Sequence, residues 1–311
     1  MTCGEKIIDK LIELNGKKPS IAFLPYKFAM WDSMETVYYA AVKKGLRTYL
    51  MPIRYVTRGD GLWHDETDLY GMANTSNCNT LYDLKPDLVV IHNPYDGNNK
   101  VTSVDPDFYS DKLKAAGFRI VYLSYCGSIW DARLILHQGI KNADFIFVDS
   151  EEERQCYIST WKQKNIDKTN DVFCCGGLPK YEAVNKHRIY PECFEKTKKK
   201  IVLVCATLVS FLNAPDQRLE KWKNAVKKYS AQENVSVIFR PHPLMDDTIN
   251  AMMKQYRLKY DSFLEEIQKY CIIDKTERFQ TAVDMSDYLV SDQSSVVEVW
   301  KRTGKPYEII D

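Results

Sequence analysis

Short apolar runs rich in β-branched residues alternate with segments of helical period along most of this chain. This alternation favours parallel sheets with helical crossovers, because parallel neighbours need a long connection between them. In such sheets, ligand-binding residues follow the carboxyl ends of the strands. We expect strands at 19–25, 47–53, 87–92, 119–125, 144–149 and 171–175 in the first half, and at 200–206, 235–240, 270–273, 287–291 and 306–310 in the second.

The length of the chain, 311 residues, suits two domains of roughly 150 residues each. A segment rich in Gly, Pro and charge, near 176–199, is typical of a connection between domains. We therefore predict an α/β protein with two Rossmann-like, doubly wound domains that face a cleft. The predicted domains are residues 1–180 and 181–311.

Helix boundaries are indicated at several places. Asp32 and Glu35 have the spacing of a capping box ahead of a helical pattern, and Gly45 is placed to end that helix. In the second half, residues 217–230 predict an amphipathic helix, and residues 247–269 predict one long helix or two shorter ones.

Composition argues against several classes of protein. The net charge of +1 lacks the basic excess of a nucleic-acid-binding protein. The nine cysteines include no CxxC pair and no Cys–His cluster at metal-ligand spacing, so we expect free thiols in a reducing compartment and no metal or cofactor. No apolar stretch approaches the roughly 18 residues of a membrane span, which predicts a cytoplasmic protein. Docking at the inner face of a membrane through the KTKKK run at 196–200 stays open, as does the oligomeric state.

The run VIFRPHPL places Arg240 and His242 after an expected strand, and Pro241 and Pro243 stiffen the backbone around them. Arg binds phosphate oxygens in fork geometry, and His can donate a proton to a leaving group. The pair therefore suits a diphosphate. The alternative is a rigid loop in which His242 caps a neighbouring backbone carbonyl.

The stretch SDQSSVVEVWKRTGKP, residues 291–306, follows another expected strand. Ser295 and Glu298 have the spacing of a capping box. The same helix N-terminus would present N–H groups and a partial positive charge, which suit an anion. Ser294 and Ser295 are therefore predicted phosphate ligands, whereas two interpretations compete for Glu298: partner in the cap, or ligand of ribose hydroxyls.

Other candidates also follow expected strands. Thr207 either binds phosphate or begins a turn, and Lys180 either meets a ligand from the hinge or is simply solvated. In the first half, residues 25–27 are candidates for an acceptor pocket. His92 and Asp96 in HNPYD are a plausible base with its orienting partner, although the segment is also good turn sequence.

Several rival enzyme classes lack their sequence signatures. The first strand is not followed by G-x-G-x-x-G, and neither a Walker A sequence nor a G-x-S-x-G elbow occurs. No D-x-D stands at a strand end to hold a metal ion under a nucleoside diphosphate. A metal-independent transferase is therefore preferred.

Taken together, the motifs of the second half resemble those of the CDP-glycerol glycerophosphotransferase family, the teichoic-acid polymerases and primases. The resemblance runs from KIVLVCATL through RPHPLM to SDYLVSDQSSVVEVWKRTGKP, and GLPK near the hinge resembles the family's G-x-P-x junction. It implies a GT-B arrangement with CDP bound mainly by the C-terminal domain. It further implies that His242 aids the departure of CMP, that Arg240 supports it, that Ser294 and Ser295 hold phosphate oxygens, and that Thr207 matches a family Thr.

The first half departs from the family. Where the family has a Trp-His-Gly-Thr motif whose His is thought to activate the acceptor, this chain has Tyr125-Cys126-Gly127-Ser128. A thiol is a poor substitute for imidazole as a base near neutral pH. Cys126 is therefore expected to contact the substrate rather than to act as the base. Three alternatives stay open: His92 or Asp96 is the base, the acceptor differs from that of the family, or the protein is inactive.

The function that these residues predict is transfer of glycerol phosphate, or a related polyol phosphate, from a CDP-activated donor. The acceptor would be a hydroxyl of a teichoic-acid-like polymer or a surface glycan. Two alternatives stay open: a GT-B glycosyltransferase that uses a UDP- or CDP-sugar, and a non-catalytic nucleotide-binding homologue.

Overall fold

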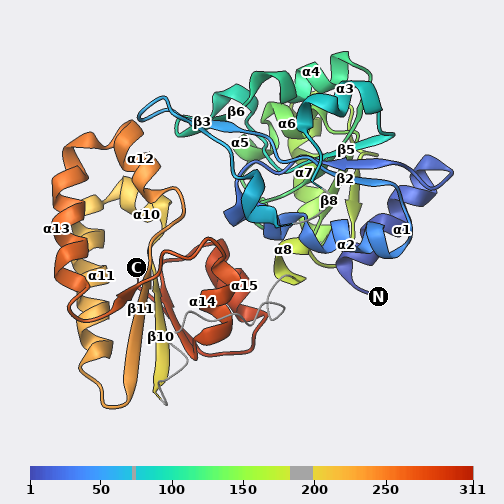
Figure 1. Ribbon diagram of the computed structural model, residues 1–311. Coiled ribbons are helices and arrows are strands. Elements are labelled where there is room, and N and C mark those ends of the chain that lie inside the picture. Colours follow the sequence, from blue (N-terminus) through green and yellow to red (C-terminus); the bar gives the residue numbers. More distant parts are fainter. Residues whose placement is uncertain (72–74, 183–198, 311) are drawn as a thin grey trace. The chain divides into compact units, whose positions relative to one another are not determined.

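The computed structural model describes residues 1–71, 75–182 and 199–310. The chain divides into two compact units, residues 1–183 and 184–311 (Figure 1), and each is described here by itself. Each unit is built on its own parallel sheet, so the expected α/β class with two Rossmann-like units is confirmed. Most of the predicted connection at 176–199, including the start of the KTKKK run, lies outside the described residues.

The main sheet of unit 1 has the strand order β2-β1-β5-β7-β8-β9, and all neighbouring strands are parallel. All six strands expected in the first half are present. Because the chain runs from β1 to β2 in one direction and from β5 to β9 in the other, the topological switch point lies between β1 and β5. The bounds are β1 Ile21–Phe23, β2 Thr48–Leu50, β5 Leu88–Ile91, β7 Arg119–Leu123, β8 Phe145–Val148 and β9 Val172–Cys174.

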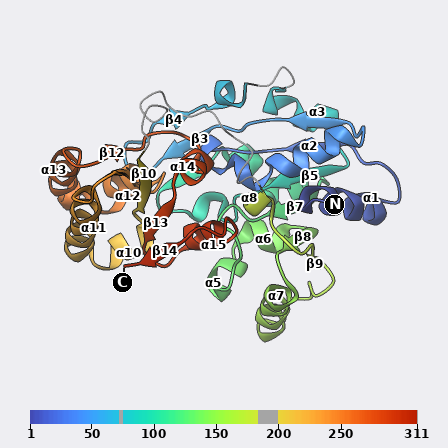
Figure 2. The ribbon, with the colours of Figure 1, turned by 90° about the horizontal axis from the view of Figure 1, so that it is seen from below.

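Helices α1 (Cys3–Asn15) and α2 (Glu35–Lys43) lie side by side in both ribbon views (Figures 1 and 2). Their apolar residues join the inner residues of β1, β5, β7 and β8 in one core cluster. A capping box of Thr2 and Glu5 starts α1. The other helices of unit 1 are α3 Leu81–Leu84, α4 Ser110–Ala115, α5 Ala132–Ile135, α6 Gln138–Asn142, α7 Glu151–Gln163 and α8 Pro179–Glu182, with 3-10 turns η1 Phe28–Ser33, η2 Thr67–Tyr70, η3 Cys78–Thr80, η4 Asp96–Asn98 and η5 Pro106–Phe108.

The capping box predicted for Asp32 and Glu35 is wrong. Asp32 lies inside η1, and α2 begins at Glu35 after Met34, which provides no side-chain cap. The other end of this helix is as expected. Gly45 follows it with a φ of +69° and donates its amide to the carbonyl of Val42, a conformation that favours glycine.

Unit 1 also contains a small antiparallel sheet, β4-β3-β6, that the sequence did not predict. Its strands are β3 Tyr55–Thr57, β4 Trp63–His64 and β6 Thr102–Val104. Charged residues and glycines flank these strands, which lack the longer apolar runs that contain the equally short β1 and β2, so the sequence carries little signal for them.

The sheet of unit 2 has the order β12-β11-β10-β13-β14, again with every pair parallel. The five strands expected in the second half are all present. Their bounds are β10 Lys200–Cys205, β11 Val235–Arg240, β12 Ile272–Ile273, β13 Tyr288–Ser291 and β14 Tyr307–Ile309.

Helices cover both faces of this sheet (Figures 1 and 2). The crossovers from β10 to β11 and from β11 to β12 run in one direction, and those to β13 and β14 run in the other, so right-handed connections place their helices on opposite faces. The first group packs through Trp222, Phe239 and Phe263. The helices are α10 Leu208–Asn213, α11 Pro215–Ser230, α12 Met245–Met252, η6 Lys254–Tyr256 and α13 Arg257–Ile267 in the first group, and α14 Phe279–Met285 and α15 Ser295–Lys301 in the second. Helix α11 covers the predicted 217–230, and the predicted 247–269 is two helices rather than one.

Candidate functional site

Three strands of unit 2 end level with one another. Cys205 at the end of β10 pairs with Arg240 at the end of β11 on one side and with Ser291 at the end of β13 on the other. Successive strands are added to one side of β10 as far as β12 and then to its other side from β13, so the topological switch point of this sheet lies between β10 and β13. The segments that follow these three strands, here called the carboxyl edge of unit 2, contain the RPHP and SDQSS motifs.

A buried carboxylate, Asp292, joins the segments at the switch point. It is 3% exposed and accepts hydrogen bonds from Thr207 Oγ1 (3.1 Å), Ser210 Oγ (2.7 Å), Arg218 (2.8 Å) and the indole of Trp222 (3.2 Å). Thr207 also shares a 2.6 Å hydrogen bond with Ser210. The hydroxyl proton of Thr207 is therefore already used inside the protein, which favours a positioning role over phosphate donation. Sequence reasoning quoted Asp292 in its motif but assigned it no role.

The guanidinium of Arg240 is bound within unit 2. It is 5% exposed, and it donates to the Asp274 carboxylate (2.5 Å), the Thr276 hydroxyl (3.0 Å) and the Glu277 carbonyl (3.4 Å). The ring of Phe279 lies 5.9 Å from it. In this structure the guanidinium pairs with Asp274 and thereby holds the segment that follows β12. The predicted contact of Arg240 with a diphosphate stays a prediction.

His242 lies two residues beyond β11 and is half-buried. Its Nδ1 accepts the backbone N–H of Leu244 at 3.1 Å, so the neutral ring carries its proton on Nε2. This bond holds the ring within the loop, although its partner is a backbone amide rather than the carbonyl that the rigid-loop interpretation expected. It also leaves His242 in the tautomer whose Nε2 is a donor, which is the form that phosphate binding requires.

The capping box predicted for Ser295 and Glu298 is wrong. The N-cap of α15 is Ser294, whose side chain makes no capping bond, and Glu298 pairs with Lys301 at 2.8 Å. The Oγ of Ser294 is buried without a hydrogen-bond partner among the described residues, and Ser295 is exposed. Ser294 therefore brings an unused hydroxyl to the carboxyl edge of unit 2. The predicted ribose contact of Glu298 stays a prediction.

In unit 1, His92 follows β5 at the switch point and is completely buried. Its Nε2 accepts the amide of Tyr26 (3.3 Å), and its Nδ1 shares a 2.9 Å bond with Ser33 Oγ, which in turn donates to the Met30 carbonyl. Burial lowers the pKa of His92 to about 3. The prediction of His92 as a general base does not fit, because a neutral imidazole with both nitrogens occupied has no site for an incoming proton.

Asp96 is not the orienting partner of His92. Its two carboxylate oxygens accept from the amide (3.0 Å) and the hydroxyl (2.6 Å) of Ser110, at the start of α4. Burial raises the pKa of Asp96, against the lowering effect of these two bonds. The HNPYD segment is thus turn structure that anchors a helix, the alternative that the sequence left open.

Lys180 is not a solvated lysine. Its side chain is 15% exposed, and its ammonium lies 3.3 Å from the Asp32 carboxylate and donates to the Tyr125 carbonyl at 2.9 Å. Lys180 therefore links the segment after β1 to the segment after β7, on the carboxyl side of the unit 1 sheet. A second buried cation, Lys27, donates to the Tyr55 hydroxyl at 3.3 Å, and Tyr55 donates to Glu66 at 2.5 Å.

The YCGS segment is a tight turn after β7. Gly127 has a φ of +86°, its carbonyl accepts from Ser124 (2.6 Å), and the Ser124 hydroxyl also contacts the Cys126 thiol (3.4 Å). Burial raises the pKa of Cys126, so this thiol is an even poorer base than an ordinary cysteine. The buried Glu153 accepts the amide of Ile129 just beyond the turn, and burial raises the pKa of Glu153 to about 7.

Two further properties concern the described residues alone. Their helices include none that is both long and apolar enough to cross a bilayer. They contain no cluster of three or more His, Cys, Asp or Glu side chains arranged to hold a metal ion. The cytoplasmic location and the membrane contact stay predictions.

No family model and no curated protein matches the sequence. Solved structures match the fold. UDP-N-acetylglucosamine 2-epimerase from Rickettsia bellii covers 93% of this chain and 78% of its own, with a TM-score of 0.58 and 14% identity. The Methanocaldococcus jannaschii enzyme in complex with UDP-GlcNAc and UDP covers 93% and 83%, with a TM-score of 0.58 and 13% identity. These likenesses confirm the fold class, two Rossmann-like domains as in GT-B enzymes.

The wall teichoic acid polymerase TagF also matches, over 98% of this chain and 74% of its own, at 12% identity. Its TM-score of 0.49 is too low to carry an argument, so the resemblance to the CDP-glycerol glycerophosphotransferase family rests on the sequence motifs.

Proposed function

We propose that this protein is an enzyme that binds a nucleoside diphosphate-activated substrate at the carboxyl edge of unit 2. The observation that carries the proposal is the level ending of β10, β11 and β13 at Cys205, Arg240 and Ser291, which brings His242 and Ser294 to one edge beside the switch point. Switch points of parallel sheets are where such folds bind nucleotides. Both side chains offer donors to a phosphate: Nε2–H of His242 and the unused Oγ–H of Ser294.

The RPHP and SDQSS motifs support a CDP-activated polyol phosphate as the substrate. In the proposed reaction an acceptor hydroxyl attacks the β-phosphorus, and the bond from that phosphorus to the bridging oxygen breaks. CMP leaves with the bonding electrons. His242 donates through Nε2 to the oxygen that gains charge, and Ser294 donates to a non-bridging oxygen. Arg240 acts indirectly, since its ion pair with Asp274 fixes the end of β11 and thereby the position of His242.

In this proposal no described residue of unit 1 acts as the base that removes the proton of the acceptor hydroxyl. His92 is buried and has both nitrogens engaged, and burial raises the pKa of the Cys126 thiol. The proposal therefore no longer includes His92 and Asp96 as catalytic residues. In the proposed reaction the phosphate of the departing CMP takes up this proton, and the protein supplies orientation and charge stabilisation.

A UDP-sugar enzyme is the second candidate. The observation that favours it is the fold likeness to UDP-N-acetylglucosamine 2-epimerases, one of them a complex with UDP-GlcNAc and UDP. The same edge of unit 2 would hold the diphosphate of either nucleotide. The two candidates differ in the nucleobase, cytosine or uracil, and in the group that the enzyme transfers or alters.

Calorimetric titration with CDP, UDP, CMP and UMP tests the proposal. We expect the wild type to bind one diphosphate, and His242→Ala and Ser294→Ala each to bind it about 10-fold or more weakly, as loss of a hydrogen bond to a charged group predicts. The matched control is Ser236→Ala, near the start of β11 and away from the carboxyl edge. Preference for UDP would select the second candidate. Absence of diphosphate binding, or binding that both site variants leave unchanged, would overturn the site.

Turnover separates an enzyme from a nucleotide-binding homologue without activity. Release of CMP from CDP-glycerol in the presence of a polyol-phosphate or glycan acceptor supports the transferase. Binding of a nucleoside diphosphate with neither release of CMP from CDP-glycerol nor conversion of UDP-GlcNAc supports the non-catalytic homologue.

A further inference from the structure

Two thiols that are far apart in the sequence meet inside unit 1. Cys3 lies in the first turn of α1, and Cys175 directly follows β9. Their sulfur atoms are 3.6 Å apart, and both side chains are buried, at 4% and 8% exposure. Both thiols also contact the carbonyl of Gly177, at 3.1 Å and 2.8 Å. Among the eight cysteines that the structure describes, all of them free, these two are the pair whose thiols are in contact.

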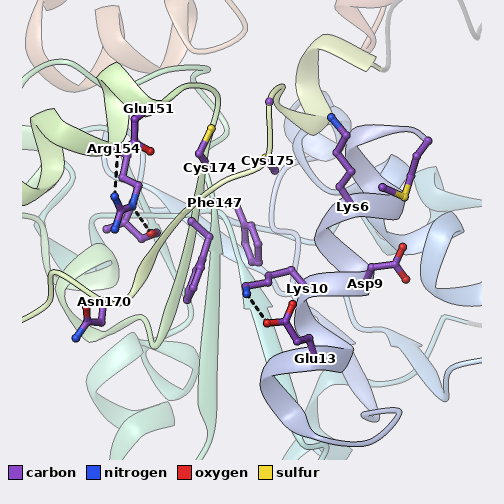
Figure 3. Close-up of a pocket in the computed structure, with 14 residues that line it drawn as sticks. Lys6, Asp9, Lys10, Glu13, Phe147, Glu151, Arg154, Asn170, Cys174 and Cys175 are labelled. Carbon is purple, nitrogen blue, oxygen red and sulfur yellow. Dashed lines mark hydrogen bonds and ion pairs between the residues drawn. The ribbon is translucent and has the colours of Figure 1, made fainter.

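One of the two residues, Cys175, lines a hollow of about 840 Å³ between α1 and the β8–α7 and β9 segments (Figure 3). Cys174, Cys175 and Gly176 line it from one side, and Lys6 lines it from α1. Cys3 is not among the residues that line this hollow.

The thiol of Cys3 is held in its neutral form. The pKa of Cys3 is raised far above its usual range, first by the hydrogen bond to the Cys175 thiol and then by burial, while Lys6 opposes the shift. Cys3 therefore keeps its proton while it is paired. Cys175, which borders the hollow, is the thiol placed to react first, and Cys3 is placed to react second.

We propose that Cys3 and Cys175 form an oxidisable dithiol that a peroxide converts to a disulfide. The Cys175 thiolate attacks one oxygen of the peroxide, the O–O bond breaks, and the departing hydroxide takes a proton to leave as water. The sulfur of Cys3 then attacks the Cys175 sulfenic acid. The S–S bond forms, the S–O bond breaks, and a second water leaves with the proton of Cys3. In sum, two thiols and one hydrogen peroxide give one disulfide and two waters.

The disulfide would strengthen a connection that already exists. Glu182 of α8 accepts the backbone amides of Cys3 and Gly4 at the start of α1, the latter at 3.0 Å. The segment from Cys175 to Glu182 is thus held to α1 at both ends, by the thiol contact and by this carboxylate. Lys180, which pairs with Asp32, lies on the same segment. Oxidation would therefore restrain the segment that positions Lys180, whatever the protein's substrate.

Peptide mapping of the folded, full-length protein tests the dithiol. After treatment of the reduced protein with hydrogen peroxide and blocking of remaining thiols, we expect a non-reduced peptide pair joined through Cys3 and Cys175, with a mass loss of about 2 Da for the two hydrogens removed. Dithiothreitol should reverse it. In Cys3→Ser the sulfenic acid of Cys175 should persist and react with dimedone, which traps that species.

Two variants serve as controls, and the wild-type map can overturn the proposal by itself. Cys78→Ser and Cys174→Ser should both keep the Cys3–Cys175 link, the second because Cys174 is exposed and its thiol contacts the Asp149 carbonyl instead. Oxidation of Cys174 alone with Cys3 and Cys175 still reduced, or a link from Cys175 to Cys174 rather than to Cys3, would overturn it. Neither result depends on a variant that folds poorly.

Discussion

The hydroxyl of Thr207 donates to the buried carboxylate of Asp292, and this bond joins the ends of β10 and β13 at the switch point of unit 2. Asp292 also neutralises Arg218 of α11, at 2.8 Å. One side chain thus fixes the geometry of the edge where His242 and Ser294 lie. We therefore predict that Asp292 acts on the proposed ligand site only through its protein partners.

Asp292→Ala is expected to destabilise the protein by about 3 kcal/mol, since the substitution leaves a largely buried cation and several buried donors without their acceptor. Urea unfolding followed by fluorescence measures the loss. The control is Asp246→Ala, whose carboxylate is 66% exposed and pairs with Arg257 at the surface. A loss below about 1 kcal/mol is expected there, as for other exposed pairs. Equal losses in both variants would contradict the anchoring role of Asp292.

Arg240 and Asp274 should behave as one unit in a double-mutant cycle. Each carries a buried charge, so Arg240→Met and Asp274→Ala are each expected to cost about 3 kcal/mol. The double variant should cost at least about 1 kcal/mol less than the sum, because it leaves no unpaired buried charge. Urea unfolding of the four proteins gives the coupling. Strict additivity would show that the ion pair does not hold the segment after β12.

The strands of both main sheets could be predicted from the sequence because apolar, β-branched runs of four or more residues stand out between helical patterns. The same alternation indicated that neighbouring strands are parallel. Parallel strands end at the same edge of the sheet, and the RPHP and SDQSS motifs do lie at one edge. The small sheet of β3, β4 and β6 could not be predicted, since charged residues and glycines interrupt the chain around its strands and leave no such apolar run.

Side-chain roles were predicted less well, because residue type does not reveal the partner. Arg240 has the chemistry of a phosphate ligand, yet Asp274, distant in the sequence, neutralises it. His92 has the chemistry of a base, yet Tyr26 and Ser33 occupy both of its nitrogens. Asp292 could have been suspected from its place directly after a buried strand, where a carboxylate needs donors.

The pH dependence of stability should contain two opposing contributions in unit 1. Burial lowers the pKa of His92 to about 3, whereas in the unfolded state it is about 6.5. As pH falls below about 6.5, the unfolded state therefore takes up a proton that the folded state does not, and the free energy of unfolding decreases. Burial raises the pKa of Glu153 to about 7, whereas in the unfolded state it is about 4.5. As pH rises from about 4.5 to 7, the unfolded state therefore loses its proton while the folded state keeps it, and the free energy of unfolding decreases. Between about pH 5 and 6.5 the two slopes cancel.

Substitution should separate these two contributions. Relative to the wild type, the unfolding free energy of His92→Gln should increase as pH falls from 6.5 to 5, and that of Glu153→Gln should decrease, each by up to ~1.4 kcal/mol per pH unit. Urea unfolding at several pH values gives both slopes. The slope is the readout rather than the stability at one pH, because either substitution in a buried site can also cost packing energy. Parallel slopes for all three proteins would contradict both assignments.

Glu298 of α15 pairs with Lys301, and this pair is compatible with a further role for Glu298 as a ligand of ribose hydroxyls. Its carboxylate is 45% exposed and contacts only Lys301 among the described residues, so Glu298→Ala should change stability by no more than about 0.5 kcal/mol. If it binds ribose hydroxyls, the same variant should bind CDP about 10-fold more weakly while its affinity for pyrophosphate stays unchanged. Lys301→Ala, which removes the ion pair but keeps the carboxylate, is the matched control and should retain CDP affinity. Unchanged CDP affinity in Glu298→Ala would leave this carboxylate with its surface ion pair alone.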